Sequence, residues 1–128
     1  MGKNVLVVED DAIIQQVLEW RLNTLGYTVC GKAATSDDAI TCVREKKPDA
    51  VLMDIDLGGL VDGIDTAVAI KKMHKVPVIF LTASSTQADI DRAKMVPADG
   101  FILKPFNDTD IRVALTLAIP DTGPKLPE

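Results

Sequence analysis

The chain has 128 residues, 47% of them hydrophobic and 26% charged, which fits a single domain with its own aliphatic core. Its net charge of −5 argues against unaided binding to a nucleic-acid backbone or an anionic membrane. No apolar run approaches the roughly 20 residues of a membrane helix, no signal peptide opens the chain, and Cys30 and Cys42 are expected to be free thiols, so we predict a cytoplasmic protein.

The first half of the chain alternates short apolar runs with segments of helical period. Strands are predicted at 4–8, 27–31 and 50–54. Helices are predicted between them, at 12–25 and 36–47. Asp10 or Asp11 can cap the first helix and Gly26 ends it, while the segment 36–38 caps the second and Pro48 stops it.

The second half continues the alternation after a loop with three glycines at 57–63, whose spacing fits neither a dinucleotide fingerprint nor a P-loop. Strands are predicted at 77–82 and 98–103. Helices are predicted at 64–74, at about 86–95, and from a cap at Asn107 or Asp108 through Leu117. Five strand–helix pairs predict an α/β fold with a parallel sheet and helices on both faces. We assign 1–119 to one domain and 120–128 to a flexible tail or the start of a linker.

A polar group follows four of the five predicted strands. Glu9 and Asp10 follow the first strand, and Asp54 ends the third. Thr82 ends the fourth strand, and Lys104 follows the fifth. Because ligands bind beyond the carboxyl ends of parallel strands, these groups are expected to meet at one edge of the sheet. Taken singly, each has a plain structural interpretation as a cap, a strand end or a solvated charge.

The combination is suited to phosphoryl transfer. Three crowded carboxylates repel one another, and a hard divalent cation such as Mg²⁺ relieves that repulsion. A hydroxyl and an ammonium can donate to phosphoryl oxygens, and a carboxylate can attack phosphorus to form an aspartyl phosphate. We therefore predict a magnesium-assisted phosphoryl-transfer site at this edge.

Four segments resemble the signature blocks of response-regulator receiver domains in two-component signalling, which include the chemotaxis regulators. They are Leu6–Asp11, Val51–Asp54, Ile79–Ala83 and Ile102–Phe106. The blocks occur in the expected order, and the resemblance covers residues 3 to 119, nearly the whole chain. It implies a flavodoxin-like doubly wound sheet of five strands in the order 2-1-3-4-5.

The resemblance also implies a role for each group at the sheet edge. Asp54 would accept a phosphoryl group from a histidine kinase or a phosphotransfer protein, and Thr82 and Lys104 would bind the phosphoryl oxygens. Mg²⁺ would be held by Glu9, Asp10, Asp54 and the backbone carbonyl of Asp56. Such a domain is not a conventional enzyme, although it assists its own phosphorylation and dephosphorylation.

The same resemblance implies a conformational switch. Phe101 lies three residues before the lysine, where the family places an aromatic switch residue, and Thr82 would couple that ring to the phosphoryl group. The face made by the fourth helix, fifth strand and fifth helix would change, and it is the expected surface for a homodimer. The Lys104–Pro105 peptide is expected to be cis.

Two features depart from the family pattern. The loop after Asp54 is longer than the common version, which contains a proline, so the choice of kinase or the metal geometry would differ. Phe101 replaces a tyrosine that is often found there, and a ring without a hydroxyl loses one hydrogen bond. We therefore expect less sharply coupled switching.

Three other classes remain open. Asp54-Ile-Asp56 also resembles the nucleophile motif of haloacid-dehalogenase-type phosphatases, but the metal acids of that family follow the lysine, whereas Glu9 and Asp10 precede Asp54. A pseudo-receiver would use the fold only for docking. A flavodoxin is the weakest alternative, because the loop after the first strand is acidic where a flavin phosphate needs donors.

Overall fold

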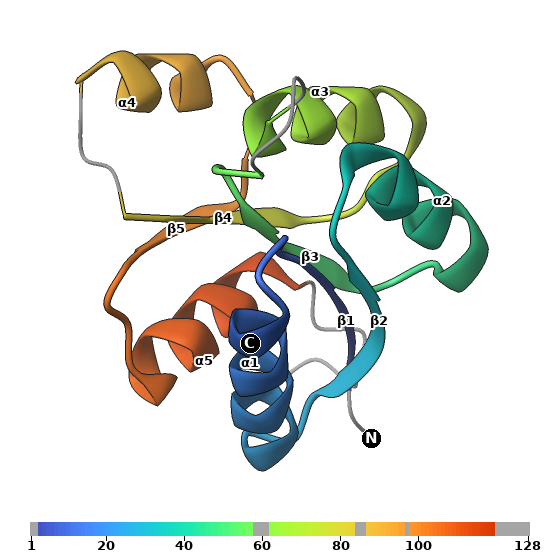
Figure 1. Cartoon of the computed structure of the whole chain (residues 1–128), viewed down its shortest axis with the longest axis vertical. Coiled ribbons are helices and arrows are strands. Elements are labelled where there is room, and N and C mark those ends of the chain that lie inside the picture. The colour runs from blue at the N-terminus through green and yellow to red at the C-terminus, as the bar shows by residue number, and fades with distance from the viewer. Residues whose placement is uncertain (1–2, 58–61, 84–86, 97, 120–128) are drawn as a thin grey trace, which may run out of the picture.

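The computed structural model describes residues 3–57, 62–83, 87–96 and 98–119, which form a parallel sheet in the order β2-β1-β3-β4-β5 (Figure 1). The strands are β1 Asn4–Val8, β2 Thr28–Ala33, β3 Ala50–Asp54, β4 Val78–Thr82 and β5 Gly100–Leu103. The helices are α1 Ala12–Thr24, α2 Ser36–Lys46, α3 Gly63–Met73, α4 Gln87–Lys94 and α5 Asp108–Ala118. The predicted flavodoxin-like, doubly wound architecture and its strand order are confirmed.

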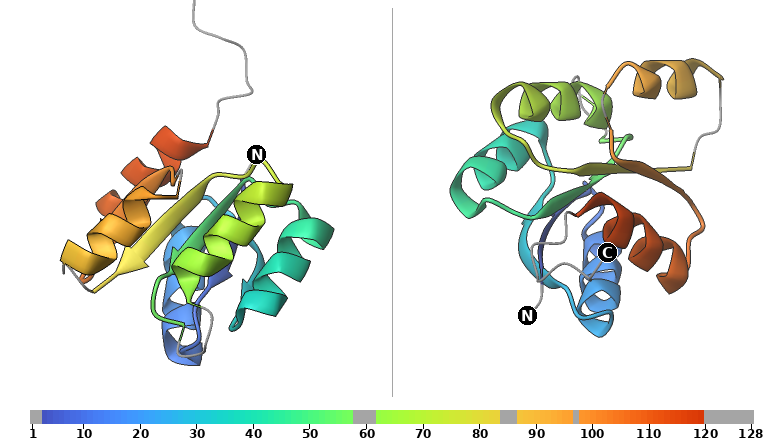
Figure 2. Two further views of the ribbon diagram at one scale, coloured as in Figure 1. Left: turned by 90° about the horizontal axis from the view of Figure 1, so that it is seen from above. Right: turned by 180° about the vertical axis from the view of Figure 1, so that it is seen from behind.

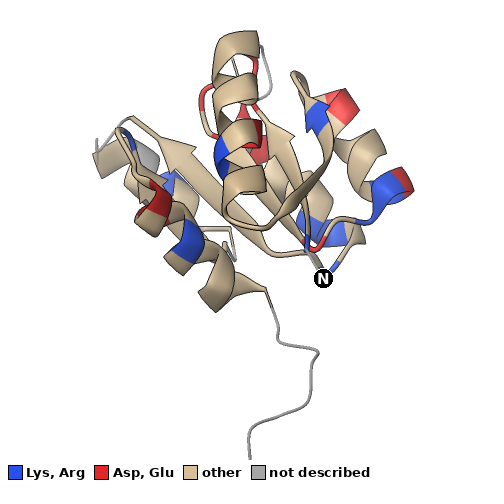
Figure 3. Ribbon diagram, turned by 90° about the horizontal axis from the view of Figure 1, so that it is seen from below, with Lys and Arg blue, Asp and Glu red and all other residues tan. Residues whose placement is uncertain are grey.

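The sheet separates two layers of helices. Figure 2 shows α2, α3 and α4 on one face and α1 and α5 on the other. Each face has its own apolar cluster, and alternate residues of the central strands point into each, so that Leu6 and Met53 lie in one cluster and Val7 and Leu52 in the other. Every residue of β3 and β4 is buried, as is typical of strands covered on both faces. Charged residues lie mainly on the helices and at strand ends (Figure 3).

The element boundaries agree with the sequence prediction to within two residues, and the caps locate the starts of the helices. Asp11 caps α1 by accepting from two backbone N–H groups, and Gly26 follows that helix with a φ of +94°. Thr35, and not the segment 36–38, caps α2, because its hydroxyl accepts from the Asp38 N–H. Asn107 caps α5, as predicted.

Several strand and helix limits were predicted with errors of one or two residues. β2 continues to Ala33, two residues beyond the predicted end, because its pairing with β1 continues through Lys32 and Ala33. β4 begins at Val78, one residue after the proline that was assigned to it, and β5 begins at Gly100. α4 covers Gln87–Lys94, slightly less than predicted. The predicted tail at 120–128 and most of the glycine-rich loop, 58–61, lie outside the described residues.

Gly63, the first residue of α3, lies against the backbone at the end of β3. A Cβ atom at this position would collide with the backbone carbonyl of Asp54 and approach Ile55 Cα to 2.8 Å. The Gly63 N–H donates to the Ile55 carbonyl at 2.9 Å, so the start of α3 is hydrogen-bonded to the segment that follows β3. A glycine is needed here for close approach of two backbone segments.

Candidate functional site

The predicted groups meet at the carboxyl edge of the sheet. Glu9 and Asp10 follow β1, Asp54 ends β3, Thr82 ends β4 and Lys104 follows β5. Backbone hydrogen bonds extend the sheet by one residue beyond three strands: Glu9 N–H to Ala33 O at 2.9 Å, Ile55 N–H to Leu81 O at 3.1 Å, and Lys104 N–H to Thr82 O at 2.9 Å. The sheet itself therefore fixes the backbone that carries these side chains.

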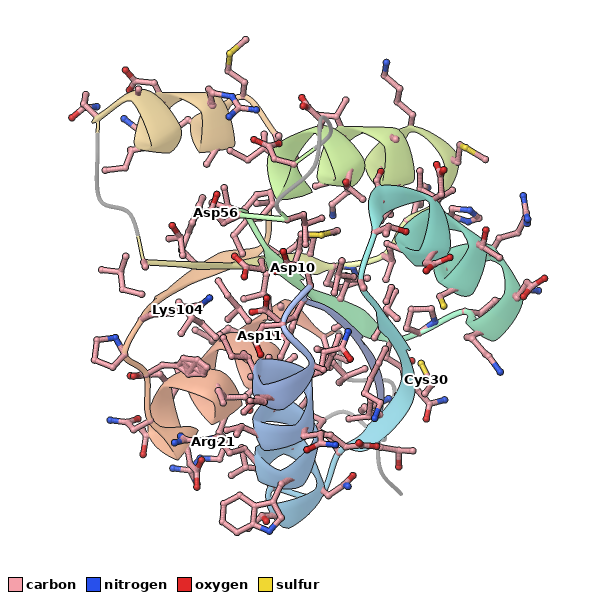
Figure 4. All side chains as sticks on the ribbon, in the orientation of Figure 1. Asp10, Asp11, Arg21, Cys30, Asp56 and Lys104 are labelled. Atoms are coloured by element: carbon pink, nitrogen blue, oxygen red, sulfur yellow. The ribbon has the colours of Figure 1, made fainter. Side chains whose placement is uncertain are left out.

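Three carboxylates form the centre of the site. Glu9, Asp10 and Asp54 each offer an oxygen, and these oxygens lie within 4.8 Å of one another. Glu9 and Asp54 are buried, with exposed fractions of 1% and 4%, while Asp10 is exposed. The cluster is thus enclosed by protein on one side and open to solvent on the other. Figure 4 shows Asp10, Asp56 and Lys104 reaching this region from three different strand ends, with Arg21 and Cys30 farther away.

Glu9 carries the strongest electrostatic perturbation in the site. Burial raises the pKa of its carboxyl group from 4.5 to about 8, and the neighbouring Asp54 adds to this effect, while the Asp11 N–H opposes it. Its Oε2 accepts from that N–H at 3.2 Å. Its Oε1 is buried and receives no hydrogen bond from the described residues. A buried carboxylate oxygen without a donor is suited to a cation.

Lys104 supplies the positive charge beside the acids. Its Nζ lies 3.2 Å from Asp54 Oδ2 and 3.5 Å from Glu9 Oε1. Burial alone would lower the pKa of this ammonium group, but the Asp54 and Glu9 carboxylates outweigh burial and raise the pKa. Lys104 is therefore a permanent cation in the physiological pH range. The Lys104–Pro105 peptide is cis, as predicted.

Asp56 and Thr82 flank the Asp54 carboxylate. The Asp56 N–H donates to Asp54 Oδ1 at 2.9 Å, so the backbone after β3 turns toward the carboxylate, while the Asp56 side chain is exposed. Thr82 is 7% exposed at the end of β4, next to the residue that pairs with Asp54 in the β3–β4 register. Each carboxylate oxygen of Asp54 thus accepts one hydrogen bond, Oδ1 from the Asp56 backbone amide and Oδ2 from the Lys104 ammonium.

Phe101, the predicted switch residue, lies on the edge strand β5 and is 50% exposed. Its ring centroid is 5.6 Å from that of Phe80, its partner in the β4–β5 register, and the two rings are tilted by 40°. Part of the ring therefore packs on the sheet and part faces solvent.

Sequence reasoning missed three residues that support the site. Gln15 bonds to the backbone at the ends of β1 and β2, Gly63 packs against Asp54, and Arg92 of α4 bonds to Asp62 at the start of α3. Gly63 follows Asp62, a cap residue, and that pair was a usable signal for the start of α3. Nothing in the sequence indicated the partners of Gln15 and Arg92, because both depend on segments that are distant along the chain.

The fold and the acid cluster define the class of protein: a flavodoxin-like α/β domain with an acidic, lysine-containing site at the carboxyl edge of its sheet. Residues 5–116 match the family described as response regulator receiver domain. The chain belongs to this family, the receiver domains of two-component response regulators.

Relatives and solved structures agree with this assignment. The chain is 34% identical over 117 residues to the transcriptional regulatory protein PdtaR of Mycobacterium tuberculosis, with 91% of this chain and 57% of the relative covered. The chain therefore spans little more than half the length of that relative.

Two solved receiver domains share the fold closely. The signal receiver domain of a modulated diguanylate cyclase from Desulfovibrio desulfuricans has a TM-score of 0.87 and 33% identity, with 93% of this chain and 94% of that one covered. The receiver domain of sensor histidine kinase PA1611 from Pseudomonas aeruginosa has a TM-score of 0.83 and 30% identity, with 92% and 98% covered, and it holds a magnesium ion in its active site cleft.

None of the helices described in the structure is long and apolar enough to span a membrane.

Proposed function

We propose that this chain is a phosphoacceptor receiver that takes a phosphoryl group onto Asp54 with the help of Mg²⁺ and then changes its protein-interaction face. One observation carries the proposal: Asp54 lies in a cluster of three carboxylates, and a lysine ammonium lies 3.2 Å from its Oδ2. This arrangement holds a nucleophile, a place for a cation and a donor for phosphoryl oxygens within one small region.

The residues fit a magnesium ion. Glu9, Asp10 and Asp54 offer oxygens within 4.8 Å of one another, and Glu9 Oε1 is buried without a hydrogen-bond donor among the described residues. Mg²⁺ prefers such hard oxygen ligands and keeps several waters, which the exposed side of the site can accommodate. We assign Glu9, Asp10, Asp54 and the backbone carbonyl of Asp56 as its ligands. When bound, the ion neutralises carboxylate charge and polarises the phosphoryl oxygens.

The chain's own residues supply the remaining chemistry. An oxygen of Asp54 attacks phosphorus, the bond from phosphorus to the donor imidazole breaks, and the imidazole leaves with that electron pair. The Lys104 ammonium, held as a cation by its neighbours, moves from Asp54 to an oxygen of the transferred group, and the Thr82 hydroxyl donates to another. The Asp56 N–H, which donates to Asp54 Oδ1, orients the carboxylate for attack.

The switch follows from the charge that phosphorylation adds. A phosphoryl group carries about −1.5 to −2 charges at neutral pH, and Thr82 at the end of β4 is placed to respond to it. Phe101, half-exposed on the neighbouring strand, is then expected to turn inward. Its hydrocarbon ring makes no hydrogen bond at its tip, so the coupling is weaker than for a tyrosine.

The surface around Phe101 is the proposed docking face. Large apolar side chains are exposed just after α4, on β5 and on α5, among them Met95 at 85%, Leu103 at 59% and Leu117 at 81%. We propose that phosphorylation promotes a homodimer through this face, that a histidine kinase or phosphotransfer protein is the donor, and that the chain acts in the cytoplasm without direct contact to nucleic acid or membrane. We also retain 1–119 as the domain and 120–128 as a tail or linker.

Phosphorylation by a small-molecule donor tests the proposal. Wild-type protein treated with phosphoramidate and Mg²⁺ should gain one phosphoryl group by intact-mass spectrometry, and Asp54→Asn should gain none. Asp56→Asn is the matched control, because it changes a nearby exposed carboxylate and should still be modified. An unmodified wild type would refute the proposal and leave a docking-only role. Turnover of small phosphate esters that requires Asp56 would indicate the phosphatase class instead.

A further inference from the structure

We propose that Gln15, on the first part of α1, is a positioning residue for the metal-binding acid Glu9. This inference rests on the proposed function, because it concerns the same magnesium site. Gln15 belongs to none of the motifs that identify the family, and its side chain does not reach the site directly. It acts on the backbone that carries Glu9.

The carboxamide of Gln15 joins the ends of two strands. Its Nε2 donates to the backbone carbonyl of Glu9 at 2.6 Å and to the backbone carbonyl of Ala33 at 3.2 Å. The Ala33 carbonyl also accepts from the Glu9 N–H at 2.9 Å. Gln15 therefore ties the carbonyl side of the Glu9 residue to the end of β2, where the sheet already holds its N–H side.

The turn between β1 and α1 is also held by the backbone of Gln15. Asp11 caps the helix, and the Gln15 N–H donates to the Asp11 carbonyl at 3.0 Å as the first helical hydrogen bond. The Asp11 N–H donates back to Glu9 Oε2 at 3.2 Å. The backbone amide and the side-chain amide of Gln15 thus fix opposite ends of the segment that carries Glu9 and Asp10.

This restraint opposes a force inside the site. The carboxylate oxygens of Glu9 and Asp54 lie within 4.8 Å of one another, and like charges at that separation repel each other. Glu9 is only 1% exposed, so without Gln15 its carbonyl oxygen would lose a hydrogen-bond donor in a buried position. The peptide group after Glu9 would then rotate until its carbonyl reached another donor. Rotation of that peptide would move the Glu9 carboxylate away from the position that the metal needs.

Removing the Gln15 side-chain amide is expected to weaken Mg²⁺ binding but to leave phosphorylation of Asp54 intact at saturating Mg²⁺. Partners that orient metal ligands typically contribute about 10–100-fold to metal affinity. Gln15 acts through the main chain and shares the task with the sheet, so we expect the lower end of that range, about a tenfold weaker Kd for Mg²⁺.

A matched pair of variants tests the role. Gln15→Met has a similar size and helix propensity but no donor, and Gln16→Met makes the same exchange at the next residue, which is exposed. Magnesium is titrated into ¹⁵N-labelled full-length protein, and the amide shifts of Asp10, Asp11 and Asp56 report binding. Gln15→Met should bind Mg²⁺ about tenfold more weakly than wild type, while Gln16→Met stays within about twofold.

The rate of Asp54 phosphorylation by phosphoramidate provides a second readout. In Gln15→Met this rate should fall at low Mg²⁺ and return to the wild-type value at saturating Mg²⁺. A Kd within twofold of wild type would overturn the positioning role, even if the variant unfolds at a lower temperature. If Gln15→Met does not fold, Gln15→Ala removes the same bonds and replaces it in both measurements.

These results separate the two proposals. Wild-type protein that binds Mg²⁺ while Gln15→Met keeps its affinity would overturn the positioning role alone. Wild-type protein that binds no Mg²⁺ at the acid cluster would overturn the proposed function and the positioning role together.

Discussion

The electrostatics of Glu9 predict a conflict between stability and function that a single substitution can expose. Burial and the neighbouring Asp54 raise the pKa of this carboxyl group from 4.5 to about 8 in the folded protein. Glu9→Gln removes the charge and keeps the shape. Without metal, we expect this variant to be more stable than wild type at alkaline pH and nearly equal to it near pH 5.

The sign follows from proton linkage. Between the ordinary pKa and about 8, folded Glu9 keeps its proton while unfolded Glu9 has lost it, so the unfolding free energy of wild type falls as pH rises through this window. At pH values below this range Glu9 is protonated in both states, and its contribution to the unfolding free energy is at its most favourable. At pH values above this range Glu9 is ionised in both states, and its contribution to the unfolding free energy no longer changes with pH.

The size of the stability difference follows from the same change in the Glu9 pKa. Each pKa unit corresponds to about 1.4 kcal/mol, so the move from 4.5 to about 8 sets an upper limit of about 5 kcal/mol on the loss. Allowing for relaxation around an ionised Glu9, we expect a difference of about 2–4 kcal/mol between Glu9→Gln and wild type at pH 9. For a domain of this size that is roughly 6–15 °C in Tm.

The assay is urea or thermal unfolding of both proteins from pH 5 to pH 9 in a metal chelator. Comparing the two proteins at each pH cancels the contributions of the titrating groups that do not interact with Glu9. Glu19→Gln is the control, because Glu19 pairs with Lys32 on the surface, away from the cluster, and its loss should give a curve parallel to wild type. Parallel curves for wild type and Glu9→Gln would refute the reasoning. Saturating Mg²⁺ should restore stability to wild type much more than to Glu9→Gln.

Three further predictions concern neighbouring groups. Asp10→Ala should weaken Mg²⁺ binding by at least tenfold in an NMR titration, because an exposed ligand is lost without disturbing the core; unchanged affinity would contradict its ligand role. Lys104→Ala should bind Mg²⁺ no more weakly than wild type, since it removes a competing cation, but beryllofluoride should no longer shift the Phe101 resonances. Arg92→Gln should lower the unfolding free energy by about 0.5–1 kcal/mol at neutral pH, while Lys94→Gln should not. Partial burial would raise the pKa of Asp62, but Arg92 and the Asp65 N–H lower it, so the Arg92 effect should disappear as pH falls below the Asp62 pKa.

The sequence was sufficient where local pattern and fold topology determine the outcome. Asp54, Thr82 and Lys104 were placed at one edge because parallel strands bring their carboxyl ends together, and a strand that is buried on both faces has a distinctive apolar run. The cap of α5 was narrowed to Asn107 or Asp108, because both precede a helical period, and the structure selects Asn107. The family resemblance then indicated a role for each residue.

What escaped prediction depends on contacts between distant segments. The cap of α2 was assigned to 36–38, although Thr35 is also a capping type, because several adjacent polar residues satisfy the same pattern. The length of β2 depends on its pairing with β1 and not on its own composition. Gln15 meets Ala33 only because β1 and β2 are neighbours in the sheet, and no local rule distinguishes it from Gln16. The pKa of Glu9 is set by burial, which sequence position alone did not indicate.

The weak attachment of α4 bears on how quickly the domain can respond. Among its described side chains only Ala93 is buried, and Arg92 holds the helix to Asp62 at 2.8 Å through a partly exposed ion pair. Such a helix has a low free energy of local opening, so its amide protons should exchange faster than those of α1 or α3 while the rest of the domain stays folded. On the proposed function, we expect the charge added at the neighbouring strand ends to shift this helix between positions without a slow, costly rearrangement of the aliphatic core.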